Sequence, residues 1–282
     1  HALDSNTTGA DNVAMGTDAL QANTTGNRNV AIGKDALTTS HNGDDCVAIG
    51  KGALSANTGG ENIAVGTSAA DANTSGVRNI AIGTNAYGAS DTENDNLAIG
   101  HGTMSTNTAG GNENVAVGNY ALDSLTSGDS NTAIGMHAMG ANTTGGSNVG
   151  IGSDSLLLAT TATGNVAVGE RSMAATTTGG NNVAVGTAAL LANTTGVSNI
   201  AIGAGALAVS TTHRFNIAIG ADTMSGAEPG DSNTAVGHAC MVANTGTQNV
   251  AMGRGALATN TTGGDNTAIG HAALYTNATT GN

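Results

Sequence analysis

Apolar and polar residues alternate in a pentapeptide that recurs along the whole chain. A typical copy is Asn29-Val30-Ala31-Ile32-Gly33, and other copies place Val, Ile, Leu or Thr second and Ile, Val or Met fourth. Alternation with a period of two and β-branched residues on one face predicts a β-strand. We expect the valine and isoleucine side chains of every copy, Ile82 among them, to point into the interior of the fold.

The residues between two pentapeptides also follow a pattern. Four positions after the pentapeptide glycine lies a second apolar residue, such as Leu37, and a small residue precedes it. This pair predicts a second short strand. It is followed by a turn such as Asn23-Thr24-Thr25-Gly26, in which Asn and Gly tolerate positive φ and Thr bonds locally. Each repeat therefore predicts strand, turn, strand, turn.

The spacing of the pentapeptide is nearly constant. Its glycine occurs sixteen times, and the intervals are 17 residues in twelve cases, 16 in two and 18 in one. Such a period predicts an all-β parallel β-solenoid, or β-roll, of about sixteen 17-residue coils, with residues 1–282 forming a single repeat array. The chain begins and ends inside a repeat, and we expect it to be a segment of a longer protein.

Equivalent residues of successive coils are expected to stack about 4.8 Å apart. Apolar side chains then form ladders, and the first pentapeptide residue forms a ladder of stacked amides. Representative members of these structural ladders are Asn29, Val30, Ile32, Gly33, Leu37, Asn79, Ile80, Ile82, Gly83, Asn199, Ile200, Ile202, Gly203 and Leu207.

The composition excludes several classes of protein. The chain has 44 Gly, 1 Pro and 1 % aromatic residues, too few large side chains for the core of a compact enzyme. Its net charge of −13, without a basic stripe, argues against a nucleic-acid partner. No apolar run approaches the roughly 20 residues of a transmembrane helix, so we expect no membrane insertion.

The two cysteines, Cys46 and Cys240, have no metal-binding or redox spacing. In a solenoid they lie more than eleven coils apart, on the order of 50 Å. A disulfide requires Cα atoms within about 7 Å. We therefore predict two free structural thiols.

No catalytic, cofactor-binding or metal-binding residues are predicted. Catalysis needs convergent, unlike groups, whereas a solenoid places like groups in rows, so an enzyme is not expected. His101, His238 and His271 directly follow a pentapeptide glycine. A symmetric assembly could form metal-binding rings from them, but other coils hold many residue types at this position, which favours exposed turn sites.

Two segments depart from the repeat and are candidates for surface contact. His213-Arg214-Phe215 combines cations with an aromatic ring, and we expect Phe215 to be exposed. The stretch 91–95 replaces the usual Thr/Gly turn, and we expect it to bulge outward. The candidate contact residues are His213, Arg214, Phe215, Asp91, Glu93 and Asp95.

A single chain is expected to need partners. Each coil offers only about three large apolar side chains against the entropy of ordering 17 residues. We therefore expect a homo-oligomer wound around a shared axis. Small side chains let another backbone approach closely, so we expect the Asn, Ala and Gly face to form the contact.

The repeats resemble those of two families of attachment proteins. Asn29-Val30-Ala31-Ile32-Gly33 is similar to the head repeats of trimeric autotransporter adhesins, whose period is shorter. The longer unit Asn-Thr-Thr-Gly-x-x-Asn-Val-Ala-Ile-Gly-x-x-Ala-Leu resembles the repeat shafts of phage tail fibres. The resemblance implies a left-handed β-roll, a homotrimer and an extracellular attachment role on a virion or a bacterial surface.

The expected function is that of a rigid extracellular fibre segment that spaces the receptor-binding tip of a phage tail fibre or a similar appendage. The alternatives are the head or stalk of a bacterial trimeric surface adhesin that binds host or matrix, and a self-assembling extracellular filament. An ice-binding solenoid is a minor alternative, because the paired threonines are adjacent in a turn rather than arranged as Thr-x-Thr rows. The expected partners are copies of the chain itself and an unidentified cell-surface receptor or glycan, with no cofactor.

Overall fold

The computed structural model describes residues 1–89, 91–106 and 110–276. The chain divides into two compact units, His1–Gly146 and Ser147–Asn282. The first unit holds β1 (Val13–Met15), β2 (Val30–Ile32), β3 (Val47–Ile49), β4 (Ile63–Val65), β5 (Ile80–Ile82), β6 (Leu97–Ile99), β7 (Val115–Val117) and β8 (Thr132–Ile134). The second holds β9 (Val149–Ile151), β10 (Val166–Val168), β11 (Val183–Val185), β12 (Ile200–Ile202), β13 (Ile217–Ile219), β14 (Thr234–Val236), β15 (Val250–Met252) and β16 (Thr267–Ile269).

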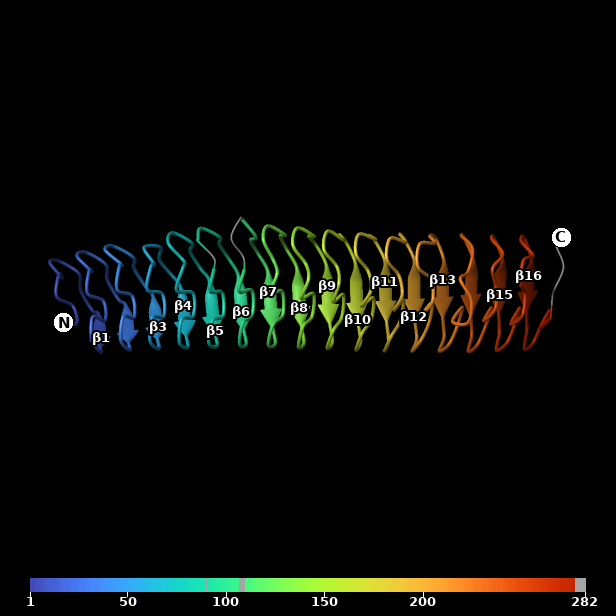
Figure 1. Ribbon diagram of the computed structural model, residues 1–282, viewed down its shortest axis with the longest axis horizontal. Coiled ribbons are helices and arrows are strands. Elements are labelled where there is room, and N and C mark those ends of the chain that lie inside the picture. The colour runs from blue at the N-terminus through green and yellow to red at the C-terminus, as the bar shows by residue number, and fades with distance from the viewer. Residues whose placement is uncertain (90, 107–109, 277–282) are drawn as a thin grey trace. The chain divides into compact units, whose positions relative to one another are not determined.

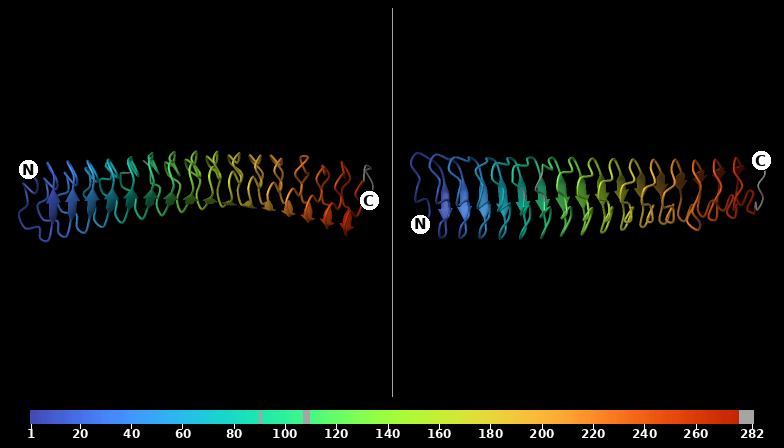
Figure 2. Two further views of the ribbon diagram at one scale, coloured as in Figure 1. Left: turned by 90° about the horizontal axis from the view of Figure 1, so that it is seen from below. Right: turned by 45° about the horizontal axis from the view of Figure 1, so that its top comes forward.

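Within each unit, every strand pairs in parallel with the strand of the next repeat. Figures 1 and 2 show the strands of each unit side by side and pointing the same way, with the chain returning through turns between them. Equivalent residues are partners, so that Val30 pairs with Val47 and Ile32 with Ile49. The prediction of an all-β parallel β-solenoid with one coil per repeat is confirmed, and the described residues contain no helix.

Each coil contains one strand rather than the two that were expected. The pair that includes Leu37 lies in a turn, and Leu37 has φ +50°, a left-handed value that a strand residue does not adopt. The turns are nevertheless bonded from coil to coil, since the Leu37 amide donates to the Ala53 carbonyl at 3.0 Å. Stacked turns thus extend the backbone ladder beyond the strands.

The side chains of the strands face the opposite way from the expectation. Ala31 and Ala81 are fully buried inside their coils, whereas Ile82 and Ile202 are each 39 % exposed. The Asn and Ala face, expected to contact another chain, is therefore the interior of the coil. A coil with a single three-residue strand is narrow, and only small or polar-bonded side chains from the strand fit within it.

The larger interior side chains come from the turn. Leu37 and Leu207 are fully buried, as are the alanines that precede them, Ala36 and Ala206. Of the predicted ladder residues, Asn29, Asn79, Asn199, Leu37 and Leu207 thus lie inside, and Val30, Ile32, Ile80, Ile82, Ile200 and Ile202 lie outside as half-buried or exposed ladders. Gly33, Gly83 and Gly203 directly follow their strands.

The asparagine ladder is confirmed and links each coil to the next. The Asn29 Oδ1 accepts the backbone N–H of residue 46 at 2.9 Å, and the Asn29 Nδ2 donates to the Gly43 carbonyl at 2.7 Å. Asn79 is bonded in the same way, through the Asn96 amide at 3.0 Å and the Glu93 carbonyl at 2.7 Å. A buried backbone N–H or C=O group without a hydrogen-bond partner lowers stability. The asparagine side chains supply partners for backbone groups that lie beyond the ends of the short strands.

Both cysteines are free and buried, as predicted. Cys46 occupies the ladder position of asparagine, and its Sγ lies 3.4 Å from the Gly59 carbonyl oxygen. Cys240 occupies the small position that Ala36 takes in another coil. Burial raises the pKa of the Cys46 thiol, and it raises the pKa of Cys240 to about 11. Both groups are therefore thiols rather than thiolates at neutral pH, which makes them weak nucleophiles.

Replacing Cys46 by Asn is expected to stabilise the first unit. The new amide would offer an oxygen to the Asn62 N–H, as Asn62 does to the Asn79 N–H at 2.9 Å. Exchanging the weak sulfur acceptor for an amide oxygen predicts an increase of up to about 1 kcal/mol in the free energy of unfolding, measurable by urea titration. The control, Cys240→Ala, should change stability by less than about 1 kcal/mol. A less stable Cys46→Asn variant would contradict the ladder.

Candidate functional site: the exposed apolar face of the strands

The outward side chains of the strands form what we call the valine–isoleucine face, that is, the first and third residues of β1 to β16. In the first unit its members include Val30, Ile32, Ile80 and Ile82, and in the second Ile200 and Ile202. Several are more than a third exposed, among them Ile63, Ile134, Val185 and Ile219. The face is therefore apolar and open to solvent in the single chain.

Register makes this face continuous within each unit. Because β2 to β8 pair residue for residue with their neighbours, each outward side chain lies about 4.8 Å from its equivalent in the next coil. Two parallel ladders of Val, Ile, Leu and Met result. Scattered apolar residues are normal on a protein surface, but a contiguous apolar patch marks an interaction site.

The polar members of the face are few and uncharged. Thr132 interrupts it in the first unit, and Thr234 and Thr267 interrupt it in the second. No position of the face carries a charge in any strand. The centres of protein interfaces are likewise depleted in charged residues. The chemistry of the face thus fits burial against another protein surface.

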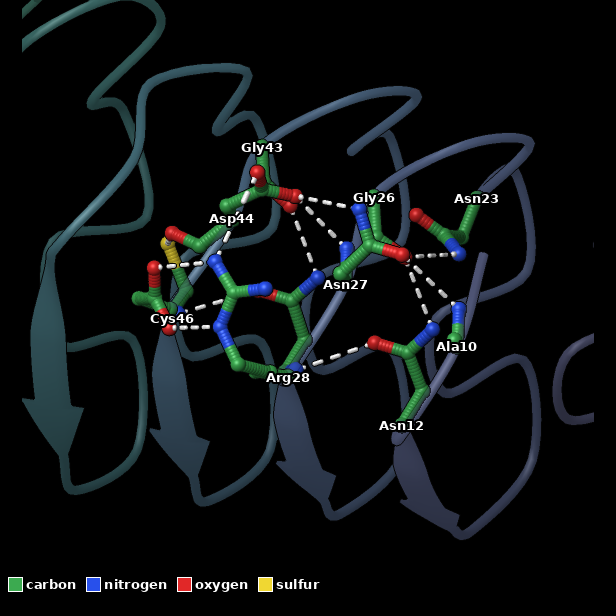
Figure 3. A network of polar contacts seen from close by, with 11 residues as sticks. Ala10, Asn12, Asn23, Gly26, Asn27, Arg28, Gly43, Asp44 and Cys46 are labelled. Atoms are coloured by element: carbon green, nitrogen blue, oxygen red, sulfur yellow. Dashed lines mark hydrogen bonds and ion pairs between the residues drawn. The ribbon is translucent and has the colours of Figure 1, made fainter. Parts of the chain in front are cut away.

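Charged side chains gather in the turn that precedes each strand. Arg28 donates from Nε and Nη2 to the two carboxylate oxygens of Asp45 at 2.6 and 2.7 Å (Figure 3), and Arg78 pairs with Asp95 in the same way. The Arg28 hydrogen bond lowers the pKa of the Asp45 carboxyl. Because these groups are largely exposed, solvent screens the pairs, and each contributes little to stability.

Side chains also hold the backbone of this turn. Figure 3 shows the Ala10 N–H bonded to the Asn27 Oδ1 at 2.9 Å and the Asn27 N–H bonded to the Asp44 Oδ1 at 2.7 Å. A short polar residue at this position therefore continues the ladder where the main chain turns away. The turn is thus a solvated structural edge of the coils.

The predicted contact segment around Phe215 is a bonded turn with an exposed ring. Phe215 is 54 % exposed, as expected, and the Arg214 guanidinium lies 5.7 Å from its ring centroid. Arg214 also pairs with Asp231 at 3.2 Å, and the His213 Nδ1 lies 2.9 Å from the Glu228 Oε2. The Arg214 charge is thus paired within the chain, and the phenyl ring of Phe215 is the exposed feature of the segment.

The second predicted contact segment does not bulge at its centre. Glu93 is 2 % exposed, and its Oε2 accepts the backbone N–H groups of Asp91 and Thr92 at 2.9 and 3.0 Å. The Glu93 carbonyl oxygen accepts a hydrogen bond from the Asn79 side-chain amide. In other coils the carbonyl oxygen of a glycine accepts this bond. The carboxylate thus caps neighbouring amides inside the turn, while Asp91 is exposed and Asp95 pairs with Arg78.

His101, His238 and His271 are exposed, in agreement with the predicted turn sites. The described residues hold no group of three or more His, Cys, Asp or Glu side chains placed for a metal ion. Over the same part of the chain, no helix has the length and apolar character needed to cross a bilayer.

The orientation of the strands is the functional feature that the sequence analysis missed, although a signal was present. The third pentapeptide residue is Ala in every copy except for Gly150, whereas the second and fourth vary among Val, Ile, Leu, Met and Thr. A position restricted to one small residue indicates a tight interior. A position that accepts threonine indicates a surface.

Comparisons with known proteins add no family to this description. Neither the protein-family models nor the curated proteins give a match to this chain.

Proposed function

We propose that the chain is a rigid segment of an extracellular attachment fibre, in which identical copies pack in parallel through the valine–isoleucine face. The observation that carries the proposal is the uncharged apolar face, which is contiguous within each unit. A second copy of the same chain presents the same ladders at the same spacing, so every coil finds an equivalent partner. The resemblance to tail-fibre shafts and trimeric adhesins favours a left-handed homotrimer.

The mechanism of such a segment is mechanical. Inter-coil hydrogen bonds run along the strands, the stacked turns and the asparagine ladder of each unit, so bending must stretch several of them together. Copies packed on the apolar face would shield it from water and resist proteolysis. The assembly would hold a receptor-binding tip away from its base on a virion or a bacterial surface.

Two alternatives share this architecture. A bacterial adhesin would use the lateral surface of the segment to bind host or matrix, and a filament would use repeated assembly alone. The ice-binding alternative is disfavoured, because the turn hydroxyls are engaged within the chain. The Thr24 Oγ1, for example, donates to the His41 carbonyl at 2.9 Å, and the Thr58 Oγ1 donates to the Thr74 carbonyl at 2.7 Å.

The oligomer is tested by sedimentation equilibrium at micromolar concentration. The expected mass is three times 27.0 kDa, or 81 kDa. A stable monomer of 27.0 kDa would contradict the proposal, and another multiple would retain the shared face but change the symmetry. A freezing-point assay without thermal hysteresis is expected. The genomic neighbourhood of the full-length gene, with tail genes or a membrane anchor, separates a phage fibre from an adhesin.

A further inference from the structure

The second unit has a surface groove whose lining residues do not belong to the valine–isoleucine face. Its lining residues belong to the coils of β14, β15 and β16, which are the orange to red coils of Figure 1. His238, Arg254, His271 and Tyr275 contribute the polar groups and the ring, and Ala239, Val242, Ala243, Gly255, Ala258, Thr259 and Ala272 complete the lining. The lining is thus mostly apolar and includes three nitrogen-bearing side chains.

The donors come from one column of the repeat. His238, Arg254 and His271 each directly follow the pentapeptide glycine of their own coil. In-register pairing of β14 with β15 and of β15 with β16 therefore places them in successive steps of about 4.8 Å. All three are exposed. Three consecutive nitrogen-bearing side chains form a row that can donate several hydrogen bonds to one anionic ligand.

The charge of this row is not neutralised by the groove. No carboxylate is among its lining residues. Arg28, Arg78 and Arg214 each pair with an aspartate, whereas Arg171 and Arg254 have no ion pair within the described part of the chain. What sets Arg254 apart is that it lies unpaired between two histidines with no carboxylate in the groove lining, in a protein of net charge −13. A guanidinium suits carboxylate and sulfate groups, which it can bind through two parallel hydrogen bonds.

The rest of the groove fits the ring of a sugar. Tyr275 is 52 % exposed and presents an aromatic surface beside the aliphatic lining residues. The Thr259 hydroxyl is engaged with the Tyr275 carbonyl at 2.7 Å, which ties the tyrosine to the preceding coil. A shallow site with an apolar surface and a few oriented donors is typical of recognition of small amphipathic ligands.

From this arrangement we infer that the groove of His238, Arg254, His271 and Tyr275 binds an acidic saccharide, with the carboxylate or sulfate on Arg254 and a ring face against Tyr275. The inference rests on the proposed function, because it identifies the class of surface ligand that the fibre would meet.

Another groove of the same unit provides a contrast. Asp154 and Arg171 flank an apolar surface of Leu157, Leu158 and Leu191. There, a carboxylate accompanies the arginine, so an anionic ligand would meet repulsion as well as attraction. An anion site is therefore inferred only at β14 to β16.

The test is isothermal titration calorimetry of residues 1–282 with three probes: 3′-sialyllactose, a sulfated heparin tetrasaccharide, and neutral lactose. We expect binding of at least one acidic probe that weakens with salt, and no measurable binding of lactose. Arg254→Gln should weaken the acidic probe at least tenfold, and Tyr275→Ser should also weaken it. Binding of 3′-sialyllactose, whose only anionic group is a carboxylate, would assign a carboxylate ligand, whereas binding of the heparin tetrasaccharide alone would point to its sulfate groups.

The matched control is Lys51→Gln. Lys51 occupies the same position after the pentapeptide glycine in the first unit, is exposed, and has no ion pair among the described residues. Its replacement removes the same charge and should change affinity less than twofold. The inferred binding site would be wrong if neither acidic probe bound, or if Arg254→Gln and Lys51→Gln lowered the affinity equally. Sedimentation equilibrium of the same samples shows whether the chain is oligomeric, so a failure to bind saccharide can be told apart from a failure to assemble.

Discussion

Ala81→Asp is expected to unfold its coil, whereas Ile82→Asp, one residue further along β5, is expected to leave the fold of the chain intact and to separate the assembled copies. Ala81 is fully buried, and Ile82 is 39 % exposed. An aspartate at position 81 would place an unpaired carboxylate inside the narrow coil, at a cost of at least about 4 kcal/mol. An aspartate at position 82 reaches water in the single chain and loses it only at an interface.

The two effects differ in their dependence on concentration. The loss of thermal stability in Ala81→Asp should be the same at all protein concentrations, because the damage lies within one coil. The loss in Ile82→Asp should grow as the protein is concentrated into the range where the unmodified chain is oligomeric. Circular dichroism melts over a hundredfold concentration series, with sedimentation of the same samples, measure both.

Ile80→Thr is the matched control for the face. The equivalent position already holds Thr132 in β8, so a hydroxyl is accepted there. We expect a change of less than about 1 kcal/mol and an unchanged oligomeric mass. A concentration-independent loss in Ile82→Asp as large as that of Ala81→Asp would show that the isoleucines face inward after all.

Gly50→Ala is expected to be strongly destabilising, and Gly52→Ala, in the same turn, is expected to be nearly neutral. Gly50 has φ +135°, and a Cβ built there would lie 2.3 Å from the carbonyl oxygen of Gly66 in the next coil. That contact is with backbone and cannot be relieved by a rotamer change. The added methyl group would force two coils apart, at a cost of at least about 3 kcal/mol.

Gly52 differs in both conformation and surroundings. Its φ is +69°, and the nearest atom to an added Cβ would be the Ser68 Oγ at 3.7 Å. Alanine already occupies the equivalent position at Ala188, with φ +55°. The left-handed strain of alanine and the reduced entropy of the unfolded chain largely offset one another, so the change should stay below about 1 kcal/mol. Urea titrations of both variants measure the difference in the free energy of unfolding. Equal losses of stability would contradict the argument that close contact between coils requires glycine at position 50.

The glycine at the end of the strand shows how far sequence alone can go. Its sixteen occurrences identify the period, and the pattern around it predicts the strand that the structure contains. The predicted second strand is wrong, because Leu37 and its equivalents adopt φ near +50°. A small residue followed by a large apolar one occurs both in strands and in stacked turns. The residue types at these two positions therefore do not show which of the two structures forms.

Glu93 and the groove at β14 to β16 illustrate what the linear pattern left open in the candidate sites. Glu93 was expected on an outward bulge, but neighbouring N–H groups hold its carboxylate inside. His238, Arg254 and His271 are 16 and 17 residues apart, and their adjacency to Tyr275 on one groove follows only from the path of the turn.

The one-coil repeat, the in-register parallel ladders, the buried amide ladder and the free cysteines could all be predicted from the amino-acid sequence, because each follows from the spacing of the repeat. Which side of the strand lies inside could be seen only once the coil was folded. Alternation with a period of two separates two faces without saying which faces the core. The width of the coil makes that choice, because its interior accepts Ala31 and the bonded Asn29 but leaves Val30 and Ile32 outside.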